Sequence, residues 1–138
     1  MKDNIYYVLL VLIHSMSNYL SHCVFQLHVH IIEARDLKPE NLDGTSDPVV
    51  NISCFGQTRC TSTKRGQLSC VYDEKFIFTL KDLLKEDFQQ GIIRIVAWDA
   101  ATLPIPGCGR KMIGAYAVDA IQVRTVCFVL LVHYRNTK

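Results

Sequence analysis

The chain has 138 residues, of which 49% are hydrophobic, so it has the size of one domain and enough apolar material for a single core. Lysine and arginine together number 15 and the acidic residues 13, which gives a net charge of +2. This balance is unlike that of a dedicated nucleic-acid-binding protein, and we expect no nucleic-acid partner.

The first 24 residues form an apolar leader. Residues 5–13 read IYYVLLVLI, a run about half as long as a membrane-spanning helix. We expect residues 1–24 to be either an extra apolar strand or a leader without structure. A secretory signal peptide is the alternative, although the segment lacks a clear small-residue cleavage pattern.

Most of the remaining chain has the pattern of short β-strands. Residues 25–31 alternate between apolar and polar side chains, as a half-buried strand does. Residues 39–48 are rich in Pro, Gly, Asn, Asp and Ser, which predicts a loop. Further strands are expected at residues 49–55, 58–63, 72–80, 92–99 and 126–132. Strands at spacings of about ten residues predict an antiparallel β-sandwich.

One short helix is expected over residues 81–90. Leu83, Leu84 and Phe88 lie at helical spacing, and Gly91 follows as a stop signal.

Six cysteines are scattered along the chain, at positions Cys23, Cys54, Cys60, Cys70, Cys108 and Cys127. They form no C-x-x-C pair, and the histidines do not supply a zinc-finger spacing. We expect free thiols in a cytosolic β protein. A disulfide framework is the alternative and would imply secretion.

Residues 35–41 read RDLKPEN and match the catalytic loop of protein kinases, in which an Asp accepts the substrate proton and an Asn binds metal. A kinase also needs a Gly-rich loop, a strand Lys paired with a helix Glu, and a downstream D-F-G, and none of these is present. The segment before Arg35 is too short for a nucleotide-binding lobe. We therefore expect no enzymatic activity.

Several segments of the chain resemble segments of C2 domains and follow one another in the same order as in that family. They are residues 27–37 (LHVHIIEARDL), 44–50 (GTSDPVV), 70–78 (CVYDEKFIF), 92–99 (IIRIVAWD) and 112–116 (MIGAY). In that family they correspond to the first core strand, the end of the first loop, a P-x-W-N-E-x-F-x-F-like strand, the strand entering the third loop, and the "IG" strand leaving it. The resemblance implies an all-β fold, an antiparallel C2-type β-sandwich of about 7–8 strands with one short helix between strands.

The C2-like domain is expected to span residues 25–134. C2 domains of this kind place two more strands after the "IG" strand, whereas residues 122–138 offer about one. The C-terminal end is therefore expected to be incomplete. The apolar run at residues 6–12 is an alternative source of the missing strand.

Within the C2 superfamily, residues 31–37, 46–50 and 55–58 and the insert at residues 81–90 resemble a ferlin C2 domain. Ferlins are large, tail-anchored proteins with several C2 domains that act in vesicle fusion and membrane repair. The resemblance implies a module of a membrane-trafficking protein, peripheral on the cytoplasmic face of membranes.

The resemblance also implies where calcium would bind. In C2 domains two loops bring together about five carboxylates, which supply the oxygen ligands that calcium requires. The matching positions here hold Asn41, Asp47, Asp99, Ala101 and Lys111. Asp43 is a further oxygen source in the first loop. Two of these five matching positions hold a carboxylate and one holds a cation. We therefore expect that the chain does not require calcium and that it binds calcium weakly or not at all. In the Ser-Asp-Pro turn, Asp47 has a structural alternative, which is to accept hydrogen bonds from backbone amides.

Two other segments are candidates for binding anionic phospholipid. Leu103 and Ile105 beside Arg110 and Lys111 suit insertion at a membrane surface, with the cations meeting headgroups. The alternative is that this apolar loop tip packs on the sandwich or on a neighbouring domain. The strand that carries Arg59, Lys64 and Arg65 corresponds to the basic phosphoinositide-binding strand of C2 domains; a solvated strand is the alternative.

The sequence therefore predicts a non-enzymatic module that binds anionic phospholipid membranes in vesicle trafficking or fusion. The alternative is a protein-interaction module that binds another C2 domain or a trafficking partner.

Overall fold

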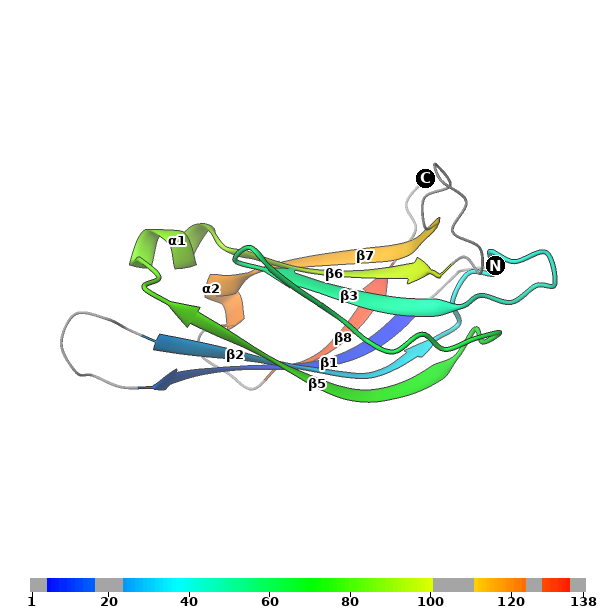
Figure 1. The fold of residues 1–138 in the computed structure, drawn as a ribbon, viewed down its shortest axis with the longest axis horizontal. Helices are drawn as coiled ribbons and strands as arrows, with labels where there is room; N and C mark the ends of the chain where they lie inside the picture. Colours follow the sequence, from blue (N-terminus) through cyan, green and yellow to red (C-terminus); the bar gives the residue numbers. More distant parts are fainter. Residues whose placement is uncertain (1–4, 17–23, 101–110, 124–127, 135–138) are drawn as a thin grey trace.

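The computed structural model describes residues 5–16, 24–100, 111–123 and 128–134, and it shows two antiparallel four-stranded sheets packed as a sandwich (Figure 1). Sheet A has the strand order β5-β2-β1-β8 and sheet B the order β4-β3-β6-β7. The strands of sheet A are β1 (Ile5–Met16), β2 (Val24–Arg35), β5 (Cys70–Lys81) and β8 (Phe128–Tyr134). Those of sheet B are β3 (Pro48–Cys54), β4 (Gln57–Cys60), β6 (Ile92–Asp99) and β7 (Lys111–Asp119). The predicted all-β sandwich is confirmed.

The apolar segment near the N-terminus is a strand inside sheet A. β1 pairs with β2 on one side and with β8 on the other, antiparallel in both cases. Its register with β2 runs from Met16 opposite Val24 to Tyr6 opposite Arg35. Residues 5–16 of the expected leader are thus a strand, and the expected domain bounds of residues 25–134 stay a prediction.

Two short helices, α1 (Lys85–Gln90) and α2 (Ala120–Val123), lie at one end of the sandwich (Figure 1). α1 starts later than the predicted helix because Lys81 still belongs to β5 and Asp82 has a φ of 55°, which is left-handed. The Leu84 N–H donates to the Asp87 carboxylate at 3.2 Å and so closes the first turn. α2 has four residues, too few to show a helical period in the sequence.

The core consists of the inward side chains of both sheets, as strand alternation requires. β2 and β5 supply Leu27, Ile31 and Phe78, and the facing sheet supplies Ile52 and Ile93, all nearly inaccessible to solvent. This packing fixes the register of β2, β3, β5 and β6, because a slip by one residue would turn their apolar sets outward.

The edge strands β4 and β5 of the two sheets are joined by side chains. The Gln57 side-chain amide donates to the Thr79 carbonyl at 2.9 Å, and the Ser62 hydroxyl donates to the Glu74 carboxylate at 2.6 Å. This seam, which we call the β4–β5 edge, closes one side of the sandwich without backbone pairing.

Cysteine burial predicts which thiols react. Cys54 and Cys70 are buried free thiols and Cys60 is exposed. Burial raises the pKa of Cys54 to about 11 and also raises that of Cys70. At pH 8, iodoacetamide is expected to modify Cys60 at least about tenfold faster than Cys54, because the thiolate is the reacting form. Peptide mass spectrometry checks this; equal rates in the native protein would contradict the burial, whereas equal rates in urea are expected.

Candidate functional site

Loop one (residues 36–47) meets two other segments at the end of the sandwich away from the helices. The Leu37 N–H donates to the Leu68 carbonyl and the Gln67 N–H to the Ser46 carbonyl, both at 2.8 Å. We call the end formed by loop one, the turn of residues 63–69, and the adjoining strand ends at Asp99 and Lys111 the loop pole.

Asp47 and Asp99 meet inside the loop pole, although 52 positions separate them in the sequence. The Asp47 N–H donates to Oδ1 of Asp99 at 2.6 Å, and the Ala100 N–H donates to the Asp47 carbonyl at 2.8 Å. Oδ1 of Asp47 accepts from the Gly66 N–H at 2.7 Å. Both carboxylates are buried, at 7% and 4% exposure. The two residues therefore connect loop one to the end of β6 and to the turn of residues 63–69.

Removing the Asp99 carboxylate is expected to lower the free energy of unfolding by about 1–3 kcal/mol, because Asp99→Ala leaves the Asp47 N–H buried without an acceptor. Urea denaturation followed by circular dichroism measures the change. Asp119→Ala is the matched control, since Asp119 is exposed and, within the part of the chain that the structure describes, its side chain accepts a long hydrogen bond from Gln122. An equal loss in both variants would contradict the structural role of Asp99.

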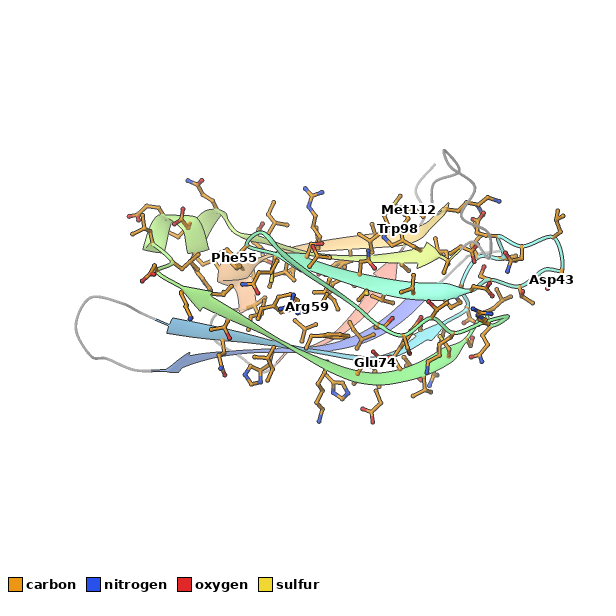
Figure 2. The ribbon with its side chains drawn as sticks, viewed as in Figure 1. Asp43, Phe55, Arg59, Glu74, Trp98 and Met112 are labelled. Atoms are coloured by element: carbon orange, nitrogen blue, oxygen red, sulfur yellow. The ribbon has the colours of Figure 1, made fainter. Side chains whose placement is uncertain are left out.

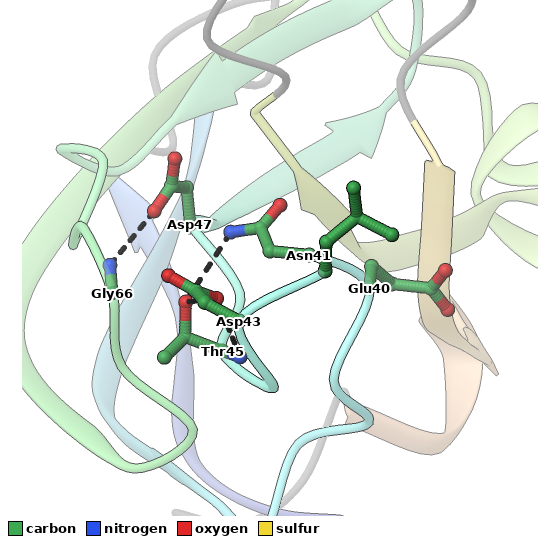
Figure 3. A pocket seen from close by; sticks show the side chains of 7 residues that line it. Glu40, Asn41, Asp43, Thr45, Asp47 and Gly66 are labelled. Atoms are coloured by element: carbon green, nitrogen blue, oxygen red, sulfur yellow. Dashed lines mark hydrogen bonds between the residues drawn. The ribbon is translucent and has the colours of Figure 1, made fainter.

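Loop one surrounds an open pocket of about 530 Å³, lined by Glu40, Asn41, Leu42, Asp43, Thr45, Asp47 and Gly66 (Figure 3). Oδ1 of Asp43 accepts from the hydroxyl of Thr45 at 2.7 Å and from its N–H at 3.0 Å, and these bonds lower the pKa of the Asp43 carboxyl. The Asn41 amide donates to the Thr45 hydroxyl at 3.4 Å. The polar side chains of the loop thus hold one another in place.

The four residues predicted as calcium ligands, Asn41, Asp43, Asp47 and Asp99, all lie at the loop pole. Each already has a partner within the protein, as described above. Over residues 5–16, 24–100, 111–123 and 128–134, no group of three or more His, Cys, Asp or Glu side chains is arranged to hold a metal ion. Calcium binding by this set stays a prediction.

Leu42 is the functional candidate that sequence reasoning missed. Its side chain lies at the tip of loop one and is fully exposed. The sequence carried one signal for it, an isolated apolar residue inside a polar loop, next to the Asp43-Gly44 turn. A solvated leucine at the tip of a loop is free to enter an apolar phase.

Cations gather at the same end. Lys111, predicted to occupy a metal-ligand position, is exposed and donates to the Glu40 carbonyl at 3.3 Å; its Nζ lies 3.8 Å from the Glu40 carboxylate. Lys38 pairs with the other Glu40 oxygen at 2.7 Å. Because Glu40 is almost covered, the exposed acids of loop one are Asp36 and Asp43. Lys38, Lys111 and the turn cations described next thus share the loop pole with the exposed acids Asp36 and Asp43, and Glu40, Asp47 and Asp99 add negative charge that is largely covered.

The predicted basic strand is divided in two. β4 ends at Cys60, so Lys64 and Arg65 lie in the turn at the loop pole, where the Lys64 N–H donates to the Pro48 carbonyl at 3.0 Å. The Lys64 ammonium lies 5.7 Å from the centre of the Tyr72 ring. Arg59 remains on β4, with its guanidinium 5.7 Å from the centre of the Phe78 ring. Arg59 therefore covers the β4–β5 edge.

Three residues proposed for membrane insertion, Leu103, Ile105 and Arg110, lie outside the described residues. The kinase-like heptad is placed differently from a catalytic loop, since it runs from the last residue of β2 into loop one. Within it Asp36 has a φ of 52° and Leu37 is buried.

The C2 domain model matches residues 25–122. Human synaptotagmin-9 is 39% identical over 79 residues, which is 54% of this chain and 16% of that protein. Human Ras GTPase-activating protein 4B is 35% identical over 101 residues, 73% of this chain and 12% of that protein. Synaptotagmin-3 of Arabidopsis thaliana is 34% identical over 76 residues, 53% of this chain and 14% of that protein.

Solved structures support the fold. A C2 domain of RIM from Drosophila superposes with a TM-score of 0.65 at 14% identity, with coverage of 96% of this chain and 97% of the other. A C2 domain of RIM2 gives a TM-score of 0.67 at 18% identity, with 96% coverage of each chain. These relatives are not ferlins, so the ferlin resemblance stays a prediction.

Proposed function

We propose that this chain, which belongs to the C2 domain family, docks its loop pole on anionic phospholipid membranes, with weak or absent dependence on calcium. Among the described residues, no helix is long and apolar enough to cross a bilayer. As a C2 relative of synaptotagmins, the chain suits a binding module in membrane trafficking.

One observation carries the proposal, namely the fully exposed Leu42 at the tip of an end that also exposes Lys38, Arg65 and Lys111. An aliphatic side chain that enters the acyl boundary gains roughly 1.5–3 kcal/mol from burial. Each nearby lysine or arginine adds on the order of 1 kcal/mol at an anionic surface. Lys38, Arg65 and Lys111 supply three such charges without any bound metal, of which the Glu40 carboxylate offsets one. The two terms together are sufficient for reversible peripheral binding.

The contacts that the carboxylates already make support the weak calcium dependence in this proposal. Calcium takes about six to eight oxygen ligands and favours a high count of negative charges. Asp47 and Asp99 each accept a backbone N–H inside the loop pole, and Glu40 faces Lys38 and Lys111. A calcium ion would have to compete with these partners.

Co-sedimentation with vesicles of phosphatidylserine and phosphatidylcholine tests the proposal. In EDTA the chain is expected to bind these vesicles but not pure phosphatidylcholine vesicles, and binding is expected to fall as salt rises, because surface attraction is screened. Added calcium is expected to change the affinity by less than about threefold. Binding that requires calcium would contradict the metal-independent part, and no binding under either condition would contradict the whole proposal.

A second candidate is protein binding through the helix pole, the end that carries α1 and α2. Leu84, Ile92 and Ile121 are exposed there. Another C2 domain is the partner that the family relationship favours. Leu84→Asp would then weaken complex formation and leave vesicle binding unchanged.

A further inference from the structure

Trp98 and Met112 form a cross-strand pair on the outer face of sheet B, next to the loop pole. They are Cα partners in the β6–β7 ladder, and the next pair toward the pole is Asp99 with Lys111. Figure 2 shows both labelled side chains on the sheet B layer, in the same half of the molecule as Asp43.

The pair presents apolar surface to solvent. Ala97 and Asp99, the neighbours of Trp98, are buried, so strand alternation turns Trp98 outward, where it is half-buried. Val49, the partner of Trp98 on β3, lies on the same outer face but is only 3% exposed, so the apolar surface here comes from Trp98 and Met112. Met112 is 56% exposed on β7, the outermost strand of sheet B. A rigid indole beside a flexible thioether therefore borders the loop pole.

This chemistry suits the membrane–water interface. Tryptophan is enriched at headgroup level because its ring is apolar while its N–H can meet water. Lys111, the strand neighbour of Met112, is exposed, and its ammonium, 3.8 Å from the Glu40 carboxylate, carries a charge that anionic headgroups attract. The pair continues directly from the end that carries Leu42, and this continuity favours the bilayer as the occupant of both.

We propose that the membrane-bound domain tilts toward sheet B, so that Trp98 and Met112 lie in the headgroup region of an anionic bilayer while Leu42 reaches deeper. The proposal rests on the membrane function of the loop pole and adds the orientation. An upright domain would touch the bilayer with loop tips alone and would leave both side chains in water.

The chain has a single tryptophan and six tyrosines, so fluorescence excited selectively at the indole reports on position 98 alone. The full chain is titrated with phosphatidylserine and phosphatidylcholine vesicles in EDTA. We expect a blue shift of the emission on binding. Phosphatidylcholine brominated close to the headgroup is expected to quench the emission more strongly than lipid brominated near the chain end.

A matched pair of variants tests Met112. Met112→Asp is expected to weaken vesicle binding by at least about threefold, because the variant no longer buries the apolar area of the methionine side chain. Ile77→Asp on β5, at a residue with a similar exposed fraction, is expected to leave binding unchanged. Equal effects would overturn the orientation.

The outcomes separate this inference from the proposed function. Wild-type protein that sediments with the vesicles without a change in emission overturns the tilt and leaves membrane binding standing. Protein that does not sediment overturns both. A shift that depends on protein concentration and occurs without vesicles indicates a second copy on this face, and it likewise overturns the tilt.

Discussion

Leu42→Asp is expected to lower the affinity for phosphatidylserine-containing vesicles by at least about tenfold. The substitution removes a side chain whose burial contributes roughly 1.5–3 kcal/mol, which corresponds to about a 10–200-fold change in affinity. It also adds a carboxylate that the anionic surface repels. The fold is expected to be unaffected, because Leu42 is fully exposed. Vesicle titration at two salt concentrations measures the effect.

Leu84→Asp is the matched control for Leu42→Asp. Leu84 is also exposed, but it precedes α1 at the opposite end of the sandwich. Both variants change the same residue type and the net charge equally. If Leu84→Asp lost as much vesicle affinity as Leu42→Asp, the loop pole would not be the binding end.

Phe78→Ala is expected to lower the free energy of unfolding by about 3–5 kcal/mol, the usual cost of emptying a buried aromatic site. Phe78 is fully buried on the inner face of β5, and Arg59 lies over its ring from β4. The variant therefore loses core packing and also weakens the β4–β5 edge. Small domains are typically stable by about 5–15 kcal/mol, so a large part of the stability would be lost. Urea denaturation gives the value.

Ile77→Ala controls for the register of β5. Ile77 is adjacent in sequence but points outward, with half of its side chain exposed. Its replacement is expected to cost less than about 1 kcal/mol. A cost equal to that of Phe78→Ala would mean that the two faces of β5 are assigned the wrong way round.

The strands could be predicted because burial alternates along them. Ile93, Ile95, Ala97 and Asp99 share one face of β6, and that alternation placed Asp99 at the entrance to the third loop. It did not show what Asp99 does there. Its partner is the backbone N–H of Asp47, and such a contact depends on how two distant segments meet.

The loop pole was harder to predict for the same reason. The strand containing Arg59, Lys64 and Arg65 was expected to be one basic surface, but β4 ends at Cys60 and the turn carries two of the cations to the loop pole. The exposure of Leu42 could not be predicted either. A loop has no periodicity, so tertiary structure alone sets which of its side chains are exposed. The predicted turn at Asp43 and Gly44 is consistent with the φ of 79° at Gly44.

The carboxylates at the loop pole have a structural role that does not require a metal. Asp47 accepts from the Gly66 N–H, one of the two roles that its Ser-Asp-Pro turn allowed, and Asp99 accepts from Asp47. The presence of these two acids is therefore compatible with a module that does not need calcium, because loop one depends on them for its position.

Charge reversal at the loop pole tests the central claim most directly. One variant carries Arg65→Glu and Lys111→Glu. The other carries Lys75→Glu and Lys81→Glu, at exposed positions on β5 in the opposite sheet, so that the net charge changes by the same amount.

Binding of both variants to phosphatidylserine-containing vesicles in EDTA is compared at low salt, after circular dichroism has shown that both are folded. We predict that the first variant loses vesicle binding and that the second keeps most of it. Equal losses would show that net charge governs attachment, and a greater loss in the second variant would place the binding surface on a face of the sandwich; either result would contradict docking through the loop pole.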